Sequence, residues 1–195
     1  MRSNKKRAAL LLAFVFTAAF LTSCSLVEPA PVETPAPAET LAPTETPVIT
    51  LAEFTTTDLD GNEVTNAVFE NAKLTFVNIW GTFCPPCLAE MPDLGKLAKS
   101  YADKDVQIIG VLVDASEETP DELALAKEIR EETGADYLHL LNSESVSYAM
   151  LYGVKSIPTS FFVNERGEVV SRLYVGARSE ADWASIFEKI LEEQP

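Results

Sequence analysis

Runs of apolar and β-branched residues alternate with stretches of helical periodicity over most of the chain after residue 49. The apolar runs have the length of buried strands, and a final pair flanks a Glu-Arg-Gly turn. The strands are expected at 74–80, 106–114 and 137–141, with a closing hairpin of 159–164 and 167–175. Between them, apolar residues recur at helical spacing. The helices are expected at 85–101, 120–133, 144–152 and 179–193.

The order of these elements predicts the fold class. The segment FTTTDLDGNEVT places Asp60-Gly61 between two short β-rich runs, which indicates an additional N-terminal β-hairpin. Strands that alternate with helices, followed by a hairpin and a last helix, predict an α/β domain. We expect a mixed central sheet covered by helices on both faces, formed by residues 49–195.

The first 23 residues have the pattern of an export signal. MRSNKKR is basic, ALLLAFVFTAAF is apolar but short for a spanning helix, and small residues follow. Leu21-Thr22-Ser23-Cys24 resembles the lipobox of bacterial lipoproteins, in which the cysteine is lipid-modified. We therefore predict a lipoprotein signal peptide at 1–23 and lipidation at Cys24, which would hold the protein on a membrane surface. An ordinary signal peptide with a cysteine near its cleavage site is the alternative.

Residues 24–48 are rich in Pro, Thr, Glu and Ala and have too few large apolar side chains to offset the entropy of the chain, so we expect a disordered tether. Four of the 15 basic residues lie in the signal, so the remaining 11 face all 30 acidic residues, a formal net charge of −19. Such a surface repels nucleic acid. Nucleic acid is therefore not an expected partner, and the spread of the acidic residues is typical of a soluble extracellular surface. We expect a monomer.

The segment WGTFCPPCLAEMP holds the chemistry-bearing motif, Cys84-Pro85-Pro86-Cys87. A zinc site would need four ligands, and the chain offers no second cysteine pair and a single histidine, His139. We therefore expect no metal, and we expect His139 to be structural. A purely structural disulfide would close too small a loop to constrain the unfolded chain much. A redox couple is the favoured interpretation.

The position of the motif supports this interpretation. Cys84 falls at the expected helix N-cap, directly after a buried strand, and Cys87 falls in the first helical turn. The helix N-terminus stabilises a thiolate, which makes Cys84 the expected nucleophile. Cys87, deeper in the helix, is the expected resolving thiol. However, Pro85 and Pro86 lack N–H groups, so we predict a Cys84 pKa only moderately below that of a free thiol and a reducing couple.

Together, WGTFCPPC, the later SIPTSFFVNERGEVV and the last helix resemble the thioredoxin-like fold. More narrowly, they resemble the TlpA/ResA group of membrane-anchored thiol–disulfide oxidoreductases, over about residues 49–193. The long stretch before Ile157-Pro158 fits the additional helix and strand of that group. The resemblance implies that Pro158 is a cis-proline facing the cysteines and that Ile157 offers backbone groups to a substrate. It also implies that Glu90 lies near the active site and affects thiol chemistry. Because Glu90 is one turn past the cysteines, we expect it to be partly buried and a proton acceptor for Cys87; a solvent-facing glutamate is the alternative.

Four other residues are expected to border the substrate. Phe83 stands where the group usually has Trp and keeps an apolar cover without the indole N–H. Pro85 and Pro86 lie between the cysteines. Trp80 is either a substrate contact or a packing residue beside the site. Asn78 occupies the place where ordinary thioredoxins keep a buried Asp, which favours Glu90 as a substitute base.

The resemblance implies a lipid-anchored disulfide reductase of exported proteins on the outer face of a bacterial membrane. No metal, nucleotide or flavin site is visible in the sequence, so we expect no cofactor and a supply of electrons from another protein. The resemblance implies that this donor is an integral membrane thiol carrier of the CcdA/DsbD kind. Cytochrome c maturation, or electron supply to a methionine sulfoxide reductase or peroxidase, would be the pathway. The alternatives are a disulfide-forming oxidant and a non-catalytic binding or metal-chaperone module on the same fold.

Overall fold

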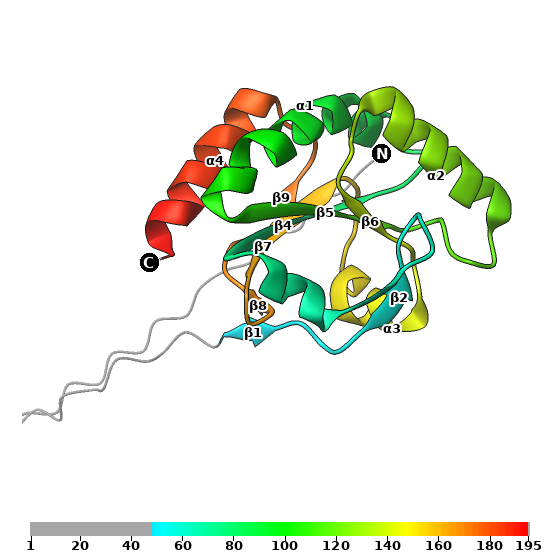
Figure 1. Ribbon diagram of the computed structural model, residues 1–195, viewed down its shortest axis with the longest axis horizontal. Coiled ribbons are helices and arrows are strands. Elements are labelled where there is room, and N and C mark those ends of the chain that lie inside the picture. The colour runs from blue at the N-terminus through cyan, green and yellow to red at the C-terminus, as the bar shows by residue number, and fades with distance from the viewer. Residues whose placement is uncertain (1–47, 195) are drawn as a thin grey trace, which may run out of the picture. The chain divides into compact units, whose positions relative to one another are not determined.

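The computed structural model describes residues 48–194, and the predicted signal peptide, lipidation site and tether lie outside these residues, apart from Val48. Within this part of the chain, the main sheet has seven strands, in the order β1-β8-β7-β4-β5-β6 with β9 also paired to β7 (Figure 1). Its strands are β1 (Ile49–Thr50), β4 (Leu74–Trp80), β5 (Val106–Leu112), β6 (Leu138–Leu140), β7 (Thr159–Asn164), β8 (Glu168–Val169) and β9 (Tyr174–Val175).

The sheet is mixed, as the sequence predicted. Strand β4 pairs in parallel with β5 and antiparallel with β7, and β5 pairs in parallel with β6. Trp80 at the end of β4 is therefore level with Leu112 at the end of β5, and Ile79 is level with Thr159 at the start of β7. One edge of the sheet thus gathers the segments that follow β4 and β5 and the segment that precedes β7.

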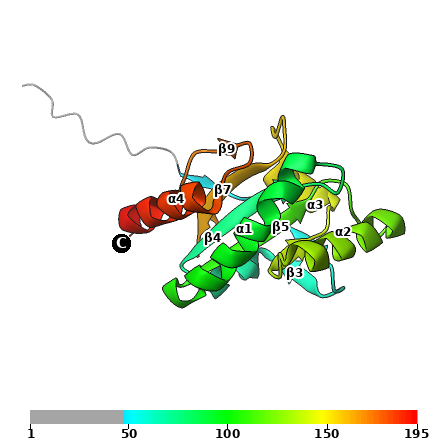
Figure 2. The same ribbon diagram turned by 90° about the horizontal axis from the view of Figure 1, so that it is seen from above.

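Three helices cover one face of the sheet: α1 (Pro85–Tyr101), α2 (Pro120–Thr133) and α4 (Glu180–Glu193). Seen from above, α4, α1 and α2 lie side by side across the strands (Figure 2). The core under α1 and α4 is aromatic, with Phe76, Phe162, Trp183 and Phe187 in contact. The core under α1 and α2 contains both cysteines of the CxxC motif.

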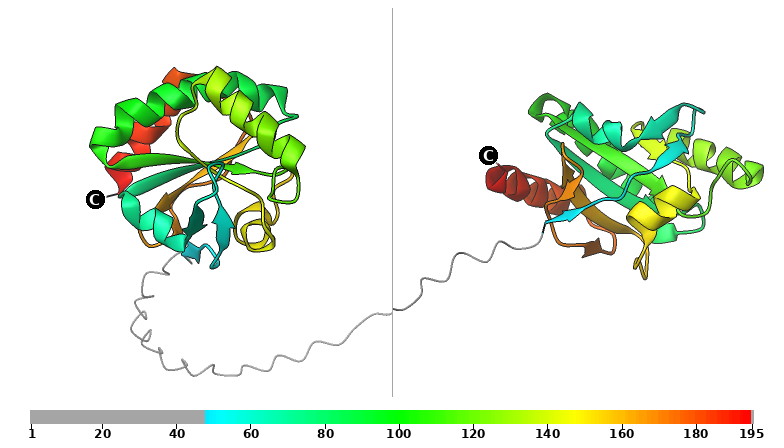
Figure 3. Two further views of the ribbon diagram at one scale, coloured as in Figure 1. Left: turned by 45° about the vertical axis from the view of Figure 1, so that its right-hand side comes forward. Right: turned by 90° about the horizontal axis from the view of Figure 1, so that it is seen from below.

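The opposite face is covered by shorter elements (Figure 3). These are the hairpin of β2 (Thr55–Thr57) and β3 (Glu63–Thr65), the 3-10 helix η1 (Asn66–Asn71), and α3 (Glu144–Val146), which continues as a π-helix over Ser147–Leu151. Phe54, Phe69 and Met150 pack there against Val77 and Val111 of the sheet. A further short 3-10 helix, Ala102–Lys104, ends α1. The predicted N-terminal hairpin and the covering of both faces are confirmed.

Helix boundaries follow local sequence rules. Pro85 and Pro120 occupy the first turns of α1 and α2, where a missing N–H costs nothing. Gly134 ends α2 in the left-handed conformation, with φ of 65°. Helix α1 continues across Pro92 to Tyr101, as the helical spacing predicted.

Three strand and helix predictions need correction. The second strand of the closing hairpin, expected at 167–175, is two short strands, β8 and β9. Between them Ser171 leaves the ladder, and its Oγ accepts from the backbone N–H of Phe162 at 2.9 Å. Strand β5 ends at Leu112 rather than residue 114, because the chain bends at residues 113–114. The helix expected over 144–152 is mostly π-helical.

Among residues 48–194, no helix is both long enough and apolar enough to cross a membrane.

Candidate active site

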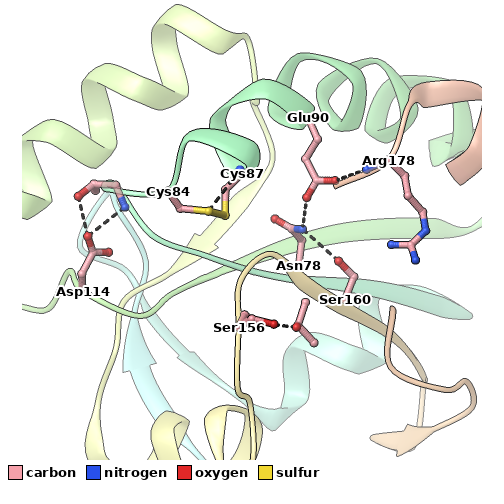
Figure 4. The surroundings of a disulfide bond; sticks show 10 residues. Asn78, Cys84, Cys87, Glu90, Asp114, Ser156, Ser160 and Arg178 are labelled. Carbon is pink, nitrogen blue, oxygen red and sulfur yellow. Dashed lines mark hydrogen bonds between the residues drawn. A yellow bond between two sulfur atoms is a disulfide. The ribbon is translucent and has the colours of Figure 1, made fainter. Parts of the chain in front are cut away.

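The two cysteines of the motif form a disulfide at the start of α1 (Figure 4). Their Cα atoms are 5.3 Å apart. Cys84 is the N-cap of the helix and retains 5% exposure, whereas Cys87 in the first turn is fully buried. The placement predicted from the sequence is confirmed, and Cys84 is the sulfur closer to solvent.

The backbone around Cys84 offers few donors to its sulfur. The Cys84 N–H turns back to the carbonyl of Gly81 at 3.1 Å, and Pro85 and Pro86 have no N–H. The N–H of Cys87 is the first in the helix, and it donates to Cys84 Sγ at 3.3 Å. An ordinary helix start presents several free N–H groups to an anion. Here a single described backbone donor faces the sulfur, so the helix N-terminus stabilises a Cys84 thiolate only in part.

A carboxylate holds the loop that leads from β4 to Cys84. Asp114 Oδ2 accepts from the backbone N–H of Thr82 at 2.9 Å and from its Oγ1 at 2.6 Å (Figure 4). Asp114 follows β5, and Thr82 follows β4, so the parallel pairing of these strands brings the two together. The sequence analysis missed this residue. Its signal is the position: a polar side chain just past the carboxyl end of the strand next to the CxxC strand.

Glu90, one turn beyond Cys87, is almost fully buried at 3% exposure. Its Oε1 accepts from Asn78 Nδ2 at 3.0 Å, and its Oε2 accepts from the Arg178 backbone N–H at 3.0 Å and from Trp183 Nε1 at 3.3 Å. Burial raises the pKa of the Glu90 carboxyl, and the hydrogen bonds from Arg178, Trp183 and Asn78 offset this in part. The solvent-facing alternative is therefore wrong. Figure 4 shows the carboxylate turned toward Asn78 and Arg178 in this disulfide state.

Trp80 is fully buried, in the same core cluster as both cysteines. The alternative that it contacts a substrate therefore does not hold in this structure, and the packing alternative does. A Cβ at Gly110 would stand 2.9 Å from Trp80 Nε1 and would overlap His139 Nδ1. The indole thus needs glycine at 110. Trp80 and His139 meet edge to face, with ring centroids 5.4 Å apart.

His139 is structural, as predicted. It is 1% exposed, its Nε2 donates to the carbonyl of Ala135 at 2.9 Å, and Tyr137 stacks on its ring. Burial lowers the pKa of His139 to about 4. The imidazole is therefore neutral at physiological pH.

The outer border of the site is apolar. The Ile157-Pro158 bond is cis, as the resemblance implied. Phe83 is 67% exposed, so it is a surface ring and not a buried cover. An ideal Cβ at Gly81 would lie 3.0 Å from the Phe83 ring and 3.2 Å from Ile157 Cδ1, so these two side chains converge on Gly81. Pro85 and Pro86 are also exposed.

Within residues 48–194, no group of three or more His, Cys, Asp or Glu side chains is placed to hold a metal ion. The arrangement instead suits thiol–disulfide exchange. One sulfur lies at a helix N-cap, the second lies within bonding distance in the first turn, and a buried carboxyl of raised pKa lies one turn further on.

Known proteins agree with this chemistry. The family model described as Redoxin matches residues 32–190. The thiol-disulfide oxidoreductase ResA of Halalkalibacterium halodurans is 31% identical over 127 residues, which cover 65% of this chain and 67% of the relative. The thiol:disulfide interchange protein DsbE of Haemophilus influenzae is 33% identical over 143 residues, 71% of this chain and 73% of the relative.

A solved structure shows the same fold. It is a thiol:disulfide interchange protein of the thioredoxin family from Chlorobium tepidum TLS, with a TM-score of 0.63 and 28% identity, covering 75% of this chain and 99% of that one. The described domain thus has a thioredoxin-like fold, with the expected helix–strand pair α2–β6 between β5 and α3. Together with the disulfide at the helix start, these matches establish that the chain belongs to the redoxin family and is a thiol–disulfide oxidoreductase of the ResA/DsbE type.

Proposed function

We propose that the protein is an extracytoplasmic, lipid-anchored reductase of disulfides in exported proteins. The observation that carries this proposal is the Cys84–Cys87 pair, placed at a helix start where a single described backbone N–H faces Cys84 Sγ. The names of the ResA and DsbE relatives support the exchange chemistry. The signal-like residues 1–23 and the lipobox-like segment ending at Cys24 support export and anchoring.

The proposed reaction begins with the reduced pair. The Cys84 thiolate attacks one sulfur of a substrate disulfide, the substrate S–S bond breaks, and the other substrate sulfur leaves as a thiolate and takes up a proton. Cys87 loses its proton and attacks Cys84 Sγ. The Cys84–Cys87 disulfide of this structure then forms, and the second substrate thiol leaves. Two electrons have passed from the enzyme to the substrate.

Glu90 is the proposed acceptor of the Cys87 proton. The raised pKa of the Glu90 carboxyl lies closer to the pKa of a thiol than that of an ordinary glutamate does. The position of Glu90 on α1, three residues after Cys87, also supports this role. The structure holds its carboxylate on Asn78, Arg178 and Trp183, so a proton acceptor role requires the carboxylate to exchange one of these partners.

The substrate is proposed to lie across the apolar border of the site. Phe83, Pro85 and Pro86 offer exposed surface beside Cys84, and the side chains of Phe83 and Ile157 converge on Gly81. Ile157 precedes the cis bond to Pro158. An extended peptide would use the backbone groups of Ile157. Without the indole N–H of a Trp at position 83, contact there would be apolar only.

The reducing direction rests on the two prolines. Each removes one N–H that would otherwise stabilise a Cys84 thiolate, and a less stable thiolate makes the reduced form a stronger electron donor. Re-reduction would come from an integral membrane thiol carrier of the CcdA/DsbD kind, with no cofactor on this chain. Cytochrome c maturation, or supply to a methionine sulfoxide reductase or peroxidase, is the proposed pathway for a monomeric enzyme.

The redox potential of the Cys84–Cys87 pair, measured by equilibration with glutathione, tests the direction. We expect a value near the thioredoxin end of the range, about −270 mV, and a Cys84 pKa only moderately below about 8.5. A potential near about −120 mV, or a Cys84 pKa near 4, would show a disulfide-forming oxidant instead. The Cys87→Ser variant should trap mixed disulfides with exported proteins, and a binding module would trap none.

A further inference from the structure

Asp114 contacts the active-site loop at a single residue, Thr82, through two hydrogen bonds. Both donors of Thr82, its backbone N–H and its Oγ1, donate to the same oxygen, Asp114 Oδ2, at 2.9 and 2.6 Å. Thr82 is 9% exposed and lies two residues before Cys84. Because the Cys84 N–H in turn donates to Gly81, the loop from Gly81 to Cys84 is closed on itself and tied to β5 through Asp114.

The second oxygen of Asp114 is unusual. Oδ1 is buried and has no hydrogen-bond partner among the described residues. Within residues 48–194, Asp114 also takes part in no ion pair with a Lys, Arg or His side chain. No cationic side chain in the described part of the chain therefore offsets the charge of Asp114 beside the loop, and an electrostatic effect is stronger where the surroundings are partly buried.

The surroundings of Asp114 contain the start of α1. The carboxylate lies beside the loop whose next residues are Phe83 and Cys84 (Figure 4). A nearby negative charge disfavours formation of a second one, so it raises the pKa of a neighbouring thiol. The loss of N–H donors at Pro85 and Pro86 and the charge of Asp114 therefore act in the same direction on Cys84.

Other titratable groups near the pair are arranged differently. Glu90 lies further along α1 and is held by Asn78, Trp183 and the backbone of Arg178, whose guanidinium packs over the Trp183 ring at 4.9 Å. His139, on β6 beneath Trp80, is buried. None of these is hydrogen-bonded to the loop of residues 81–83 in the described part of the chain.

We infer that Asp114 is a positioning residue for the exchange reaction: it fixes the loop that presents Cys84, and its charge opposes thiolate formation there. In the reduced enzyme the Cys84 proton would consequently be held more tightly, and the dithiol would donate electrons more readily. The inference rests on the exchange chemistry of the pair, and it deepens the proposed reducing direction without depending on its substrate.

The test compares two carboxylates of the same loop. Asp114→Asn removes the charge and keeps an oxygen that can accept from Thr82. Glu118→Gln is the matched control, because Glu118 is exposed, four residues further on, and carries the same charge. The pKa of Cys84 is read from the pH dependence of its alkylation by iodoacetamide, and the redox equilibrium from titration with glutathione.

For Asp114→Asn we expect the Cys84 pKa to fall by about 0.5 unit, so that alkylation below this pKa is about threefold faster. At a pH above the Cys84 pKa, the equilibrium with glutathione should shift about threefold toward the dithiol, which corresponds to about 14 mV at 29.6 mV per tenfold. Glu118→Gln should shift neither quantity measurably. If Asp114→Asn shifts them no more than Glu118→Gln does, the inference is wrong.

A second variant separates position from charge. Asp114→Ala removes the charge and both acceptors, so exchange with a disulfide-bonded peptide, at a pH where Cys84 is ionised, should be about fivefold slower than for Asp114→Asn. Equal rates in the two variants would overturn the positioning role. If Asp114→Ala does not fold, the Asp114→Asn comparison still decides the charge effect. A wild-type redox potential at the oxidising end of the range would contradict the proposed reducing direction. The change in Cys84 pKa caused by Asp114→Asn would still decide the inference about Asp114.

Discussion

Two carboxylates flank the redox pair, and their surroundings differ in kind. Glu90 is almost fully buried and accepts from three segments that are distant in sequence: β4 through Asn78, the residue Arg178 before α4, and α4 itself through Trp183. Asp114 is half-buried, and its carboxylate accepts only from Thr82 among the described residues, on the loop that leads to Cys84. Glu90 therefore joins α1 to the rest of the domain, whereas Asp114 holds one loop.

The difference shows how one chemical group can serve two purposes at a site. A carboxyl whose burial raises its pKa holds its proton to a higher pH than an exposed one, even when it is well hydrogen-bonded. A carboxylate whose two bonds go to one neighbour orients that neighbour and adds a fixed charge beside it. Changes around Glu90 should accordingly appear first in stability and pH dependence, and changes around Asp114 first in the chemistry of Cys84.

The largest effect is expected for Asn78→Asp, which replaces the donor to Glu90 with a second carboxylate. The two oxygens would meet at about the present 3.0 Å in a buried site, where like charges cannot both ionise. We expect the free energy of unfolding at pH 7 to fall by about 3 kcal/mol. The loss should shrink as the pH is lowered, because one carboxyl takes up a proton. Urea unfolding at pH 7 and pH 5 measures both.

The control for Asn78→Asp is an Asn–Asp pair on the opposite face of the sheet. Asn62 donates to Asp58 Oδ2 at 2.9 Å, but Asn62 is exposed in the turn of the N-terminal hairpin. Asn62→Asp also sets two carboxylates together, and water screening should limit its cost to less than about 1 kcal/mol. Equal losses for the two variants would mean that burial does not distinguish the Glu90 network.

Glu90→Gln is expected to have the next largest effect. Because burial raises the folded pKa of Glu90 above its ordinary 4.5, the protonated form is favoured in the folded state. Its contribution to stability is fully present below about pH 4.5 and is lost as the pH rises through the folded pKa. Gln cannot satisfy all three donors, so the variant should be less stable by about 1–2 kcal/mol near pH 4.5. The deficit should narrow as the pH rises.

The pH profile must be taken as a difference between variant and wild type. His139, with its pKa lowered to about 4 from 6.5, contributes stability that is present above pH 6.5 and is lost as the pH falls toward 4. This pH dependence of stability is opposite in sign to that of Glu90. It cancels when the free energy of unfolding of the variant is subtracted from that of wild type at each pH. A deficit that stays constant from pH 4.5 to pH 8 would contradict a raised Glu90 pKa.

Much of the fold follows from local sequence, because local rules govern the elements around the site. The strand 74–80 and the helix 85–101 have the predicted boundaries, since an apolar β-branched run ends at Trp80 and prolines open the helix. The break between β8 and β9 could not be predicted this way. There the Ser171 hydroxyl replaces a backbone acceptor, and an exchange of this kind leaves no trace in the apolar pattern.

The candidate site also has some features that follow from local sequence and others that do not. Cys84 at the N-cap and Cys87 in the first turn follow from spacing alone. Thr82 and Asp114 are 32 residues apart and meet only because β4 and β5 are neighbours in the sheet. Glu90 and Arg178 are 88 residues apart and meet only because α1 packs beside α4. Such pairs depend on strand order and helix packing, which a single sequence does not state.

The smallest effect is expected for Thr82→Val, which removes one of the two bonds to Asp114 without changing charge or shape much. The backbone N–H of Thr82 still donates to Asp114 Oδ2, so the loop should remain in place. We expect the free energy of unfolding to fall by about 1 kcal/mol, the ordinary value of one hydrogen bond. The Cys84 pKa should stay close to that of wild type, because the charge of Asp114 is retained. A loss above about 3 kcal/mol would mean that this loop supports the whole domain, and the contrast with Glu90 would then fail.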